Sequence, residues 1–302
     1  MLLTVAVCTW NRSRLLRQCL EQMTKLDIPG GVEWELLVVN NNCTDDTDHV
    51  VDSFVSRLPV RLLFEAKPGQ SNARNAAVRE AKGQYILWTD DDVLVDEKWI
   101  ANYTKAFQRW PEAAVFGGPI TPWFVETPPT WLEQVWPRVA DAYAIRDLGP
   151  EPVQFDGRKR TPYGANFVVR TNEQQRNLYD ARLGLRPGSS IRGEEIDLVN
   201  KLLTEGNAGW WVPGAGVRHY VPPERMTTRY LRDYYLGYGQ YLAMKEPAWE
   251  GPTILGKPRW LWRQIITAEL KYRFHRLTSP PEVWIRELID ARVSFGRFVR
   301  MK

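Results

Sequence analysis

Four short apolar runs recur near the start of the chain, at intervals of about thirty residues. Stretches with helical periodicity separate them; in the first, Leu16, Leu20 and Met23 fall on one helical face. Strand, helix and strand at this spacing predict βαβ units, and therefore a parallel sheet with helices on both faces. The predicted strands are Leu3–Val7, Leu36–Val39, Val60–Phe64 and Tyr85–Trp88.

Two further helices are predicted between these strands. One has an apolar face made of Val50, Val51, Phe54 and Val55. The other carries a row of alanines that begins at Ala73.

Polar loops follow each predicted strand directly. In parallel sheets, ligands bind beyond the carboxyl ends of the strands, so these loops should form one site. They carry amides that can read a base edge, cations for phosphates and carboxylates for a metal. The chain has neither G-x-G-x-x-G nor a P-loop motif, which counts against a dinucleotide oxidoreductase and a P-loop enzyme. The loops are Thr9–Arg12, Asn40–Asp46, Lys67–Asn75 and Asp90–Asp92.

The last of these loops consists of three consecutive carboxylates. Like charges this close repel one another unless a cation neutralises them. Oxygen ligands favour a hard divalent ion, so Mn²⁺ or Mg²⁺ is the expected cofactor. The alternative is a solvated acidic turn.

Composition indicates a soluble globular protein: 44% of the 302 residues are hydrophobic and 25% are charged. No apolar run reaches the roughly 18 residues of a spanning helix, and Met1–Val7 lacks the features of a signal peptide. The three cysteines have no metal-type spacing, so we expect reduced thiols and a cytoplasmic location.

Seven motifs together resemble the successive signatures of the inverting family 2 glycosyltransferases with the GT-A fold. The resemblance covers roughly residues 1–220. It implies a Rossmann-like mixed sheet with helices on both faces, in a domain over 1–223 whose nucleotide-binding half is about 1–118 and whose acceptor half is about 119–223. The motifs are T-V-A-V-C-T-W-N-R, V-V-N-N-N-C-T-D-D-T, P-G-Q-S-N-A-R-N-A-A, W-T-D-D-D-V, G-A-N-F-V-V-R and G-E-E-I-D-L, followed by V-P-G-A-G-V-R-H.

The resemblance implies a set of residues that hold a nucleotide diphosphate-sugar. The Asn40–Asn41 pair stands where the family commonly has Asp, so the base stays open, with UDP as the expectation. Asp90 is expected to reach the ribose, with Asp91 in support. The implied set is Thr9, Asn11, Arg12, Asn40, Asn41, Arg74, Asp90 and Asp91.

The resemblance also implies the reacting groups. Glu195 matches the catalytic base of the family, with Glu194 as the substitute. The alternative is that both glutamates are only the acidic first turn of a helix. Asp92 and His219 match the metal ligands, although a lone histidine is as often structural.

Asn166 and Trp123 are expected to contact the donor sugar or the acceptor. Trp123 lies in the Pro- and Trp-rich segment 120–160, which could form an aromatic wall against a sugar. Packing against the following helix is the alternative.

Residues 224–302 are predicted to form a basic amphipathic helical extension, with a linker over Pro247–Pro258. Residues 257–302 carry eleven Lys and Arg against four Asp and Glu, a net charge of +7 in a chain of +4 overall. Such helices can lie peripherally on an anionic membrane surface, here the inner face, or they can cap the domain or join a homo-oligomer. Nucleic acid is not an expected partner, since no reading motif accompanies the charge.

The sequence therefore predicts a metal-dependent inverting glycosyltransferase that moves a sugar to a hydroxyl acceptor, a glycan or a lipid-linked one. Polysaccharide or glycolipid synthesis is the setting that the resemblance implies. The rivals are a sugar nucleotidyltransferase, which would want a Gly-rich basic loop after the first strand, and a non-catalytic nucleotide-sugar or glycan-binding protein.

Overall fold

A computed structural model describes residues 1–157, 160–189, 191–247 and 249–300. The chain forms two compact units, each assembled from separate segments. The first unit contains Met1–Trp123, Ala144–Arg182 and Glu194–Tyr220. The second contains Phe124–Tyr143, Leu183–Gly193 and the chain from Val221 onward.

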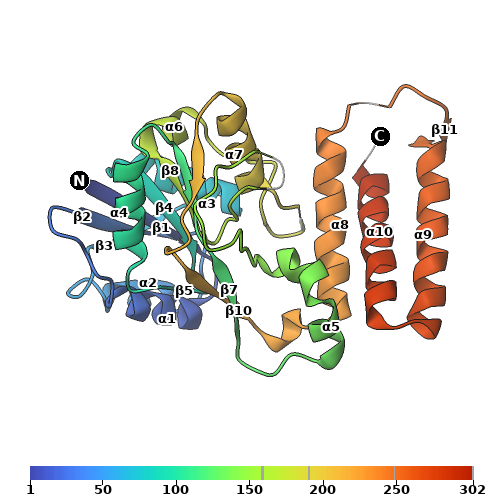
Figure 1. The fold of residues 1–302 in the computed structure, drawn as a ribbon, viewed down its shortest axis with the longest axis horizontal. Helices are drawn as coiled ribbons and strands as arrows, with labels where there is room; N and C mark the ends of the chain where they lie inside the picture. Colours follow the sequence, from blue (N-terminus) through green and yellow to red (C-terminus); the bar gives the residue numbers. More distant parts are fainter. Residues whose placement is uncertain (158–159, 190, 248, 301–302) are drawn as a thin grey trace. The chain divides into compact units, whose positions relative to one another are not determined.

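A seven-stranded mixed sheet is the centre of the first unit (Figure 1). The four predicted strands pair in parallel, as the βαβ pattern indicated. Beyond them, β8 runs antiparallel to both β4 and β6, and β9 is parallel to β6. The order across the sheet is β3 (Val60–Phe64), β2 (Glu33–Asn40), β1 (Leu2–Thr9), β4 (Tyr85–Asp90), β8 (Phe167–Arg170), β6 (Val115–Gly117) and β9 (Gly209–Trp211).

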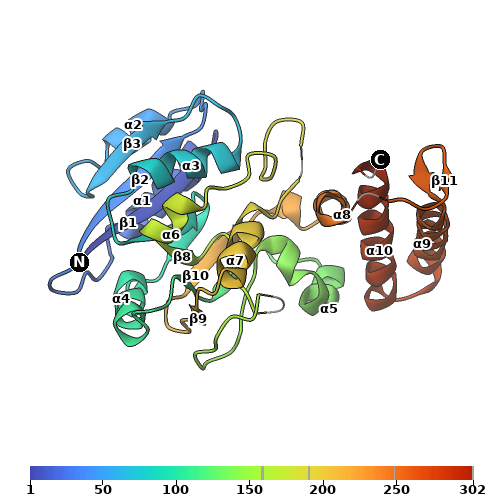
Figure 2. The ribbon, with the colours of Figure 1, turned by 90° about the horizontal axis from the view of Figure 1, so that it is seen from above.

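Alternate side chains of each strand enter two cores, one on each face of the sheet. On β1, Val5 faces the core that α1, α2 and α4 cover, and Ala6 faces the core that α3 and α7 cover. Both residues are fully buried. Figure 2 shows helices on both faces of the sheet. The bounds are α1 (Ser13–Met23), α2 (Thr47–Asp52), α3 (Gln70–Glu80), α4 (Trp99–Arg109), α6 (Thr171–Arg176) and α7 (Glu194–Thr204).

The α2 region departs from the predicted apolar face. Val50, Val51 and Phe54 are buried as expected, but Val55 is 59% exposed. The helix ends at Asp52 and the chain continues in turns, so helical periodicity no longer places Val55 on the buried face.

A second, three-stranded sheet is formed by β5 (Val93–Val95), β10 (Val217–Val221) and β7 (Ile120–Phe124). The strand β5 begins directly after the three carboxylates, and it pairs antiparallel with β10 so that His219 lies opposite Val93. This pairing brings a distant histidine next to the carboxylate loop.

The second unit is helical. It contains α5 (Thr130–Val139), α8 (Thr228–Lys245), α9 (Arg259–Thr278) and α10 (Pro281–Arg300), with short 3₁₀ turns at Ala140–Tyr143 and Pro223–Arg225. The predicted linker is not structureless, because β11 (Thr253–Ile254) and β12 (Lys257–Pro258) form a small hairpin within it. Over the described residues, every helix is too short or too polar to span a bilayer.

Candidate active site

Strand register places the ends of β1, β2 and β4 level with one another. Thr9 pairs with Asn40, and Cys8 pairs with Asp90, so the loops after all three strands start at one edge of the sheet. The sequence predicted this meeting from strand direction alone.

Two carboxylates and an imidazole converge at this edge. Potential ligand atoms of Asp90, Asp92 and His219 all lie within 4.8 Å of one another. His219 Nε2 is 3.4 Å from Asp92 Oδ1, and both side chains are almost fully buried. His219 Nδ1 is also buried and has no hydrogen-bond partner among the described residues. Carboxylate oxygens with one imidazole suit a hard to intermediate divalent ion, so the donor set fits Mn²⁺ or Mg²⁺.

Asp91, the middle carboxylate, is turned towards the first loop. It accepts a hydrogen bond from Thr9 Oγ1 at 2.7 Å and one from Arg12 Nη1 at 3.1 Å. Burial raises the pKa of Asp91 to about 6, although Arg12 and Thr9 counteract the shift. Asp91 therefore ties the carboxylate loop to Thr9 and Arg12.

Arg12 lies against the same cluster. Its Nη1 also donates to Asp92 Oδ2 at 2.9 Å. Burial alone would lower the pKa of Arg12, but Asp91 and Asp92 outweigh it and raise that pKa. A guanidinium beside the cluster can also contact a phosphate.

Arg74 joins the carboxylate edge to the first turn of α7. Its side chain is 3% exposed, and it lies 3.2 Å from Glu194, 3.6 Å from Asp90 and 4.0 Å from Glu195. Gln70 completes this network. Its amide nitrogen donates to Glu194 Oε1 and its amide oxygen accepts from Arg74 Nη2, each at 3.1 Å. Burial also raises the pKa of Asp90, while Arg74 counteracts that rise.

The two candidate glutamates differ in their surroundings. The Glu194 side chain is 4% exposed and is paired with Arg74, whereas that of Glu195 is 20% exposed. Gly164 lies against Glu195: a Cβ on this glycine would be 3.2 Å from Glu195 Oε1 and 3.0 Å from Arg74 Nη2. Sequence reasoning did not select Gly164 as a site residue, although it begins the G-A-N-F-V-V-R motif.

Asn40 and Asn41, at the end of β2, bind groups of neighbouring segments. Asn41 Nδ2 donates to the carbonyls of Glu65 and Lys67, and its Oδ1 accepts from Gly69 N. Asn40 Nδ2 donates to Asp48 Oδ1. These bonds take both N–H donors of Asn41 and one of Asn40, so Asn41 has no donor left to read a base edge as the sequence predicted.

Asn11 connects two of the loops. Its Oδ1 accepts from Thr44 N at 2.7 Å, and its φ of 53° is a left-handed conformation that asparagine tolerates. Asn11 thus holds the loop after β2 against the loop after β1.

Asn166 lies in the core rather than at the edge. It is fully buried, its Oδ1 accepts from Trp99 Nε1 and Tyr103 Oη, and its Nδ2 donates to the carbonyls of Pro119 and Ala215. These four bonds use the whole capacity of the amide, so the predicted contact with a sugar has no group left to make it.

Trp123, the other predicted sugar contact, is half-buried and packs edge-to-face on Tyr220 at 5.2 Å between ring centroids. Two more tryptophans of the same segment pack within the second unit, Trp131 on Trp284 and Trp136 on Tyr143. Packing therefore accounts for these two rings.

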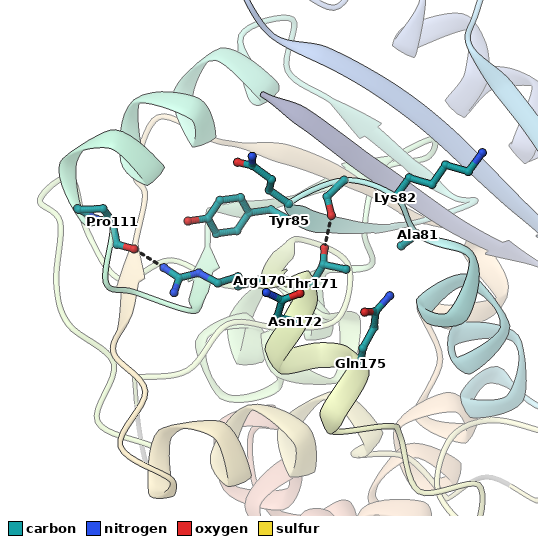
Figure 3. A pocket seen from close by; sticks show the side chains of 10 residues that line it. Ala81, Lys82, Tyr85, Pro111, Arg170, Thr171, Asn172 and Gln175 are labelled. Atoms are coloured by element: carbon teal, nitrogen blue, oxygen red, sulfur yellow. Dashed lines mark hydrogen bonds between the residues drawn. The ribbon is translucent and has the colours of Figure 1, made fainter.

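A separate hollow of about 540 Å³ lies at the opposite end of β4 (Figure 3). It is lined by Lys82, Tyr85 and Arg170 among others, and Arg170 Nη2 donates to the carbonyl of Pro111. Tyr85 is the first residue of β4, whereas Asp90 is the last, so this hollow is distinct from the carboxylate edge.

Comparison with known families accounts for this arrangement. The family described as Glycosyl transferase family 2 matches residues 4–177, which include the first four loops and β8. The chain belongs to this family.

Two relatives illustrate the range of family 2 proteins that this chain is similar to. It is 25% identical over 229 residues to the succinoglycan biosynthesis protein ExoM of Rhizobium meliloti (strain 1021), covering 75% of this chain and 69% of that protein. It is 28% identical over 97 residues to the poly(ribitol-phosphate) beta-N-acetylglucosaminyltransferase TarS of Staphylococcus aureus (strain Mu50), which is 32% of this chain and 17% of that one.

Solved structures show that the family 2 chain has the GT-A type of fold. The mannosyltransferase PcManGT from Pyrobaculum calidifontis, in complex with GDP-Man and Mn²⁺, superposes with a TM-score of 0.61 at 18% identity, covering 97% of this chain and 86% of that one. TarS 1–349 of S. aureus, in complex with UDP-GlcNAc, superposes with a TM-score of 0.54 at 17% identity. The match covers 92% of this chain and 73% of that one.

Proposed function

We propose that this family 2 glycosyltransferase moves a sugar from a nucleotide diphosphate-sugar to a hydroxyl acceptor with inversion, and that the transfer depends on a divalent cation. The observation that carries the proposal is the pair of Asp92 and His219, buried together at the carboxyl edge with a third ligand, Asp90, within reach. Buried carboxylates this close are costly unless a cation compensates them.

Asp92 and His219, with Asp90, would hold Mn²⁺ or Mg²⁺. A cation there supplies charge stabilisation for the diphosphate that leaves. The residues themselves prepare the site: Arg12 and Thr9 orient Asp91, and Arg74 holds Asp90. Arg12, whose side chain is 39% exposed, is the proposed cationic contact for the phosphates. Arg74 is buried and supports the site by holding Asp90.

Glu195 is the proposed base. It is the more exposed of the two glutamates, and Gly164, which has no side chain, packs against its carboxylate. As the acceptor oxygen attacks the anomeric carbon, Glu195 takes the hydroxyl proton, and the bond from that carbon to the diphosphate oxygen breaks on the opposite face. The new glycosidic bond therefore has the inverted configuration.

Glu194 is proposed to act through its neighbours. Its carboxylate is buried against Arg74, so it is not accessible to an acceptor hydroxyl. By fixing Arg74 and the first turn of α7, it positions Glu195. This divides the two roles that the sequence left open.

A uridine diphosphate-sugar is the proposed donor, on the family resemblance. With the amides of Asn40 and Asn41 engaged, we propose that they order the base-binding loops and leave recognition to other groups of those loops. The names of the relatives support an acceptor in the synthesis of a polymer such as a polysaccharide. A glycolipid acceptor and transfer at the cytoplasmic face of a membrane are proposed on the family resemblance alone. A catalytic domain over 1–223 with a helical extension over 224–302 remains part of the proposal.

A panel of nucleoside diphosphates and their sugars, with and without Mn²⁺, tests the proposal by thermal shift. We expect uridine ligands to raise Tm only when Mn²⁺ is present. Asp92→Asn should abolish this shift, whereas Asp52→Asn, at an exposed carboxylate on α2, should keep it. A shift that survives Asp92→Asn unchanged would remove the metal site from the account.

A further inference from the structure

One face of α9 is left uncovered in the second unit. The helices α8, α10 and α9 lie in a row with α10 in the middle, as both views show (Figures 1 and 2). The buried residues of α9 are Leu261, Ala268 and Tyr272. At 100° per residue these three fall on one side of the helix, the side that packs on α10.

The opposite side of α9 carries an apolar stripe. Ile266, Leu270, Phe274 and Leu277 follow one another at intervals of four, four and three residues and share one helical face. Their exposed fractions, in that order, are 54%, 63%, 64% and 88%. Single exposed apolar residues are ordinary, but a continuous row of four on one helix indicates a contact surface.

Basic side chains accompany this stripe. Arg259, Arg263, Lys271 and Arg273 are all exposed. The structure describes all of α9, and Glu269 is the one acidic residue in it. Glu269 already pairs with Arg273 and Arg292, at 2.9 Å each. The exposed side of α9 is thus apolar along its middle and positively charged around it.

The hairpin before α9 extends the apolar surface. Leu255 at its tip is 85% exposed, and Ile254 is 46% exposed. Trp262 Nε1 donates to the carbonyl of Ile254 at 2.9 Å, which fixes the hairpin to the first turn of α9.

We propose that this face of α9, with the hairpin tip, docks on an anionic lipid bilayer. Charge complementarity favours a lipid surface over a second copy of the chain as the partner of this face. A second copy meeting this face through a two-fold axis would bring its own arginines against these ones, whereas anionic headgroups neutralise them. The stripe then enters the boundary between headgroups and acyl chains, as the apolar face of an interfacial helix does. The inference does not depend on the proposed sugar transfer.

Sedimentation of the full chain with lipid vesicles tests the inference. We expect binding to vesicles that contain phosphatidylglycerol, weaker binding to pure phosphatidylcholine, and loss of the difference at high salt. Leu270→Gln with Phe274→Gln should weaken binding about ten-fold or more, because less apolar surface is buried. Arg263→Gln with Lys271→Gln should weaken binding to anionic vesicles about ten-fold or more and reduce the salt effect.

Val55→Gln is the matched control, since Val55 is 59% exposed and lies in the first unit. It should bind vesicles like the unchanged chain. All of these positions are on the surface, so equal melting temperatures should verify that the variants fold. Two results would overturn the inference: equal pelleting of the Leu270/Phe274 variant and the unchanged chain, or a dimer in solution that this variant converts to a monomer.

Discussion

Arg74 Nη1 lies 3.2 Å from Glu194 Oε1, with both side chains buried beneath the carboxylate edge. Three aromatic rings surround the guanidinium, those of Trp88, Phe167 and Tyr179, with centroids 5.5 to 5.8 Å from its central carbon. Burial opposes the charge of Arg74, yet Glu194 and the other acids outweigh it and raise the pKa of Arg74. This buried pair holds the first turn of α7 against α3.

Removing the charge of Glu194 should therefore affect folding first. Breaking one side of a buried ion pair costs about 3 to 5 kcal/mol, so we expect Glu194→Gln to lower the free energy of unfolding by about 3 kcal/mol. Glu195→Gln is the control and should cost about 1 kcal/mol or less, mainly through the helix dipole. Urea unfolding of both variants measures the difference. Equal losses would contradict the division between a buried positioning glutamate and an exposed base.

Asn166 should matter for stability because it holds four partners in the core. Asn166→Ala leaves the Trp99 and Tyr103 donors unsatisfied, and each buried unsatisfied group costs about 1 to 3 kcal/mol. We expect a total loss of about 3 kcal/mol or more. The exposed Asn172, changed to Ala, should stay within about 0.5 kcal/mol of the unchanged chain. A stable Asn166→Ala chain with impaired donor binding would restore Asn166 to the substrate site.

The cation should stabilise the chain more at neutral than at acid pH. The pKa of Asp91 is raised to about 6 and that of Asp90 is also raised, in both cases chiefly by burial. The folded chain therefore binds these protons more tightly than the unfolded one, and without metal the free energy of unfolding falls as pH rises from about 4 to about 6.

Metal binding needs deprotonated carboxylates, so the stabilisation that the metal gives should increase over the same pH range, from about 4 to about 6. We expect Mn²⁺ to raise Tm at pH 7 and to raise it much less at pH 5. Differential scanning calorimetry at both pH values is the measurement. A shift of the same size at each pH would mean that Mn²⁺ binds elsewhere, and a shift retained by Asp92→Asn would mean the same.

The three thiols should differ in reactivity. Burial raises the pKa of Cys8 to about 12 and also raises that of Cys19, which is 1% exposed. Thiolates are the reactive form, so both should resist alkylation of the native chain at pH 8. Cys8 and Cys43 are both half-buried, but Cys8 lies within strand β1 whereas Cys43 lies in the loop after β2. Mass spectrometry after brief iodoacetamide treatment should find label on Cys43, and label on Cys8 at a similar rate would contradict the packing of β1.

Strand order explains how much of this structure the sequence could predict. A parallel strand fixes which end faces which edge, so the loops at Thr9 and Asp90 could be placed together from periodicity alone. The antiparallel strands β6 and β8 could not be predicted in this way, because each is short and buried and has no alternating pattern.

Side-chain roles inside the site were harder to predict than its place. The partners of Asn166 are Trp99 and Tyr103 on α4, which lie 67 and 63 residues away in the chain. No local spacing reports such contacts, so a motif position and a core position are indistinguishable in sequence. The same holds for Asn41, whose amide is satisfied by backbone groups at Glu65, Lys67 and Gly69.

Steady-state sugar transfer by Glu195→Gln, compared with its donor affinity, tests the central claim most directly. If Glu195 accepts the acceptor's proton, kcat should fall by about 10² to 10⁴, the range for a general base. The Kd for a uridine diphosphate-sugar with Mn²⁺, measured by titration calorimetry, should stay within about two-fold, since the base does not hold the donor. Transfer at the rate of the unchanged chain would contradict the account.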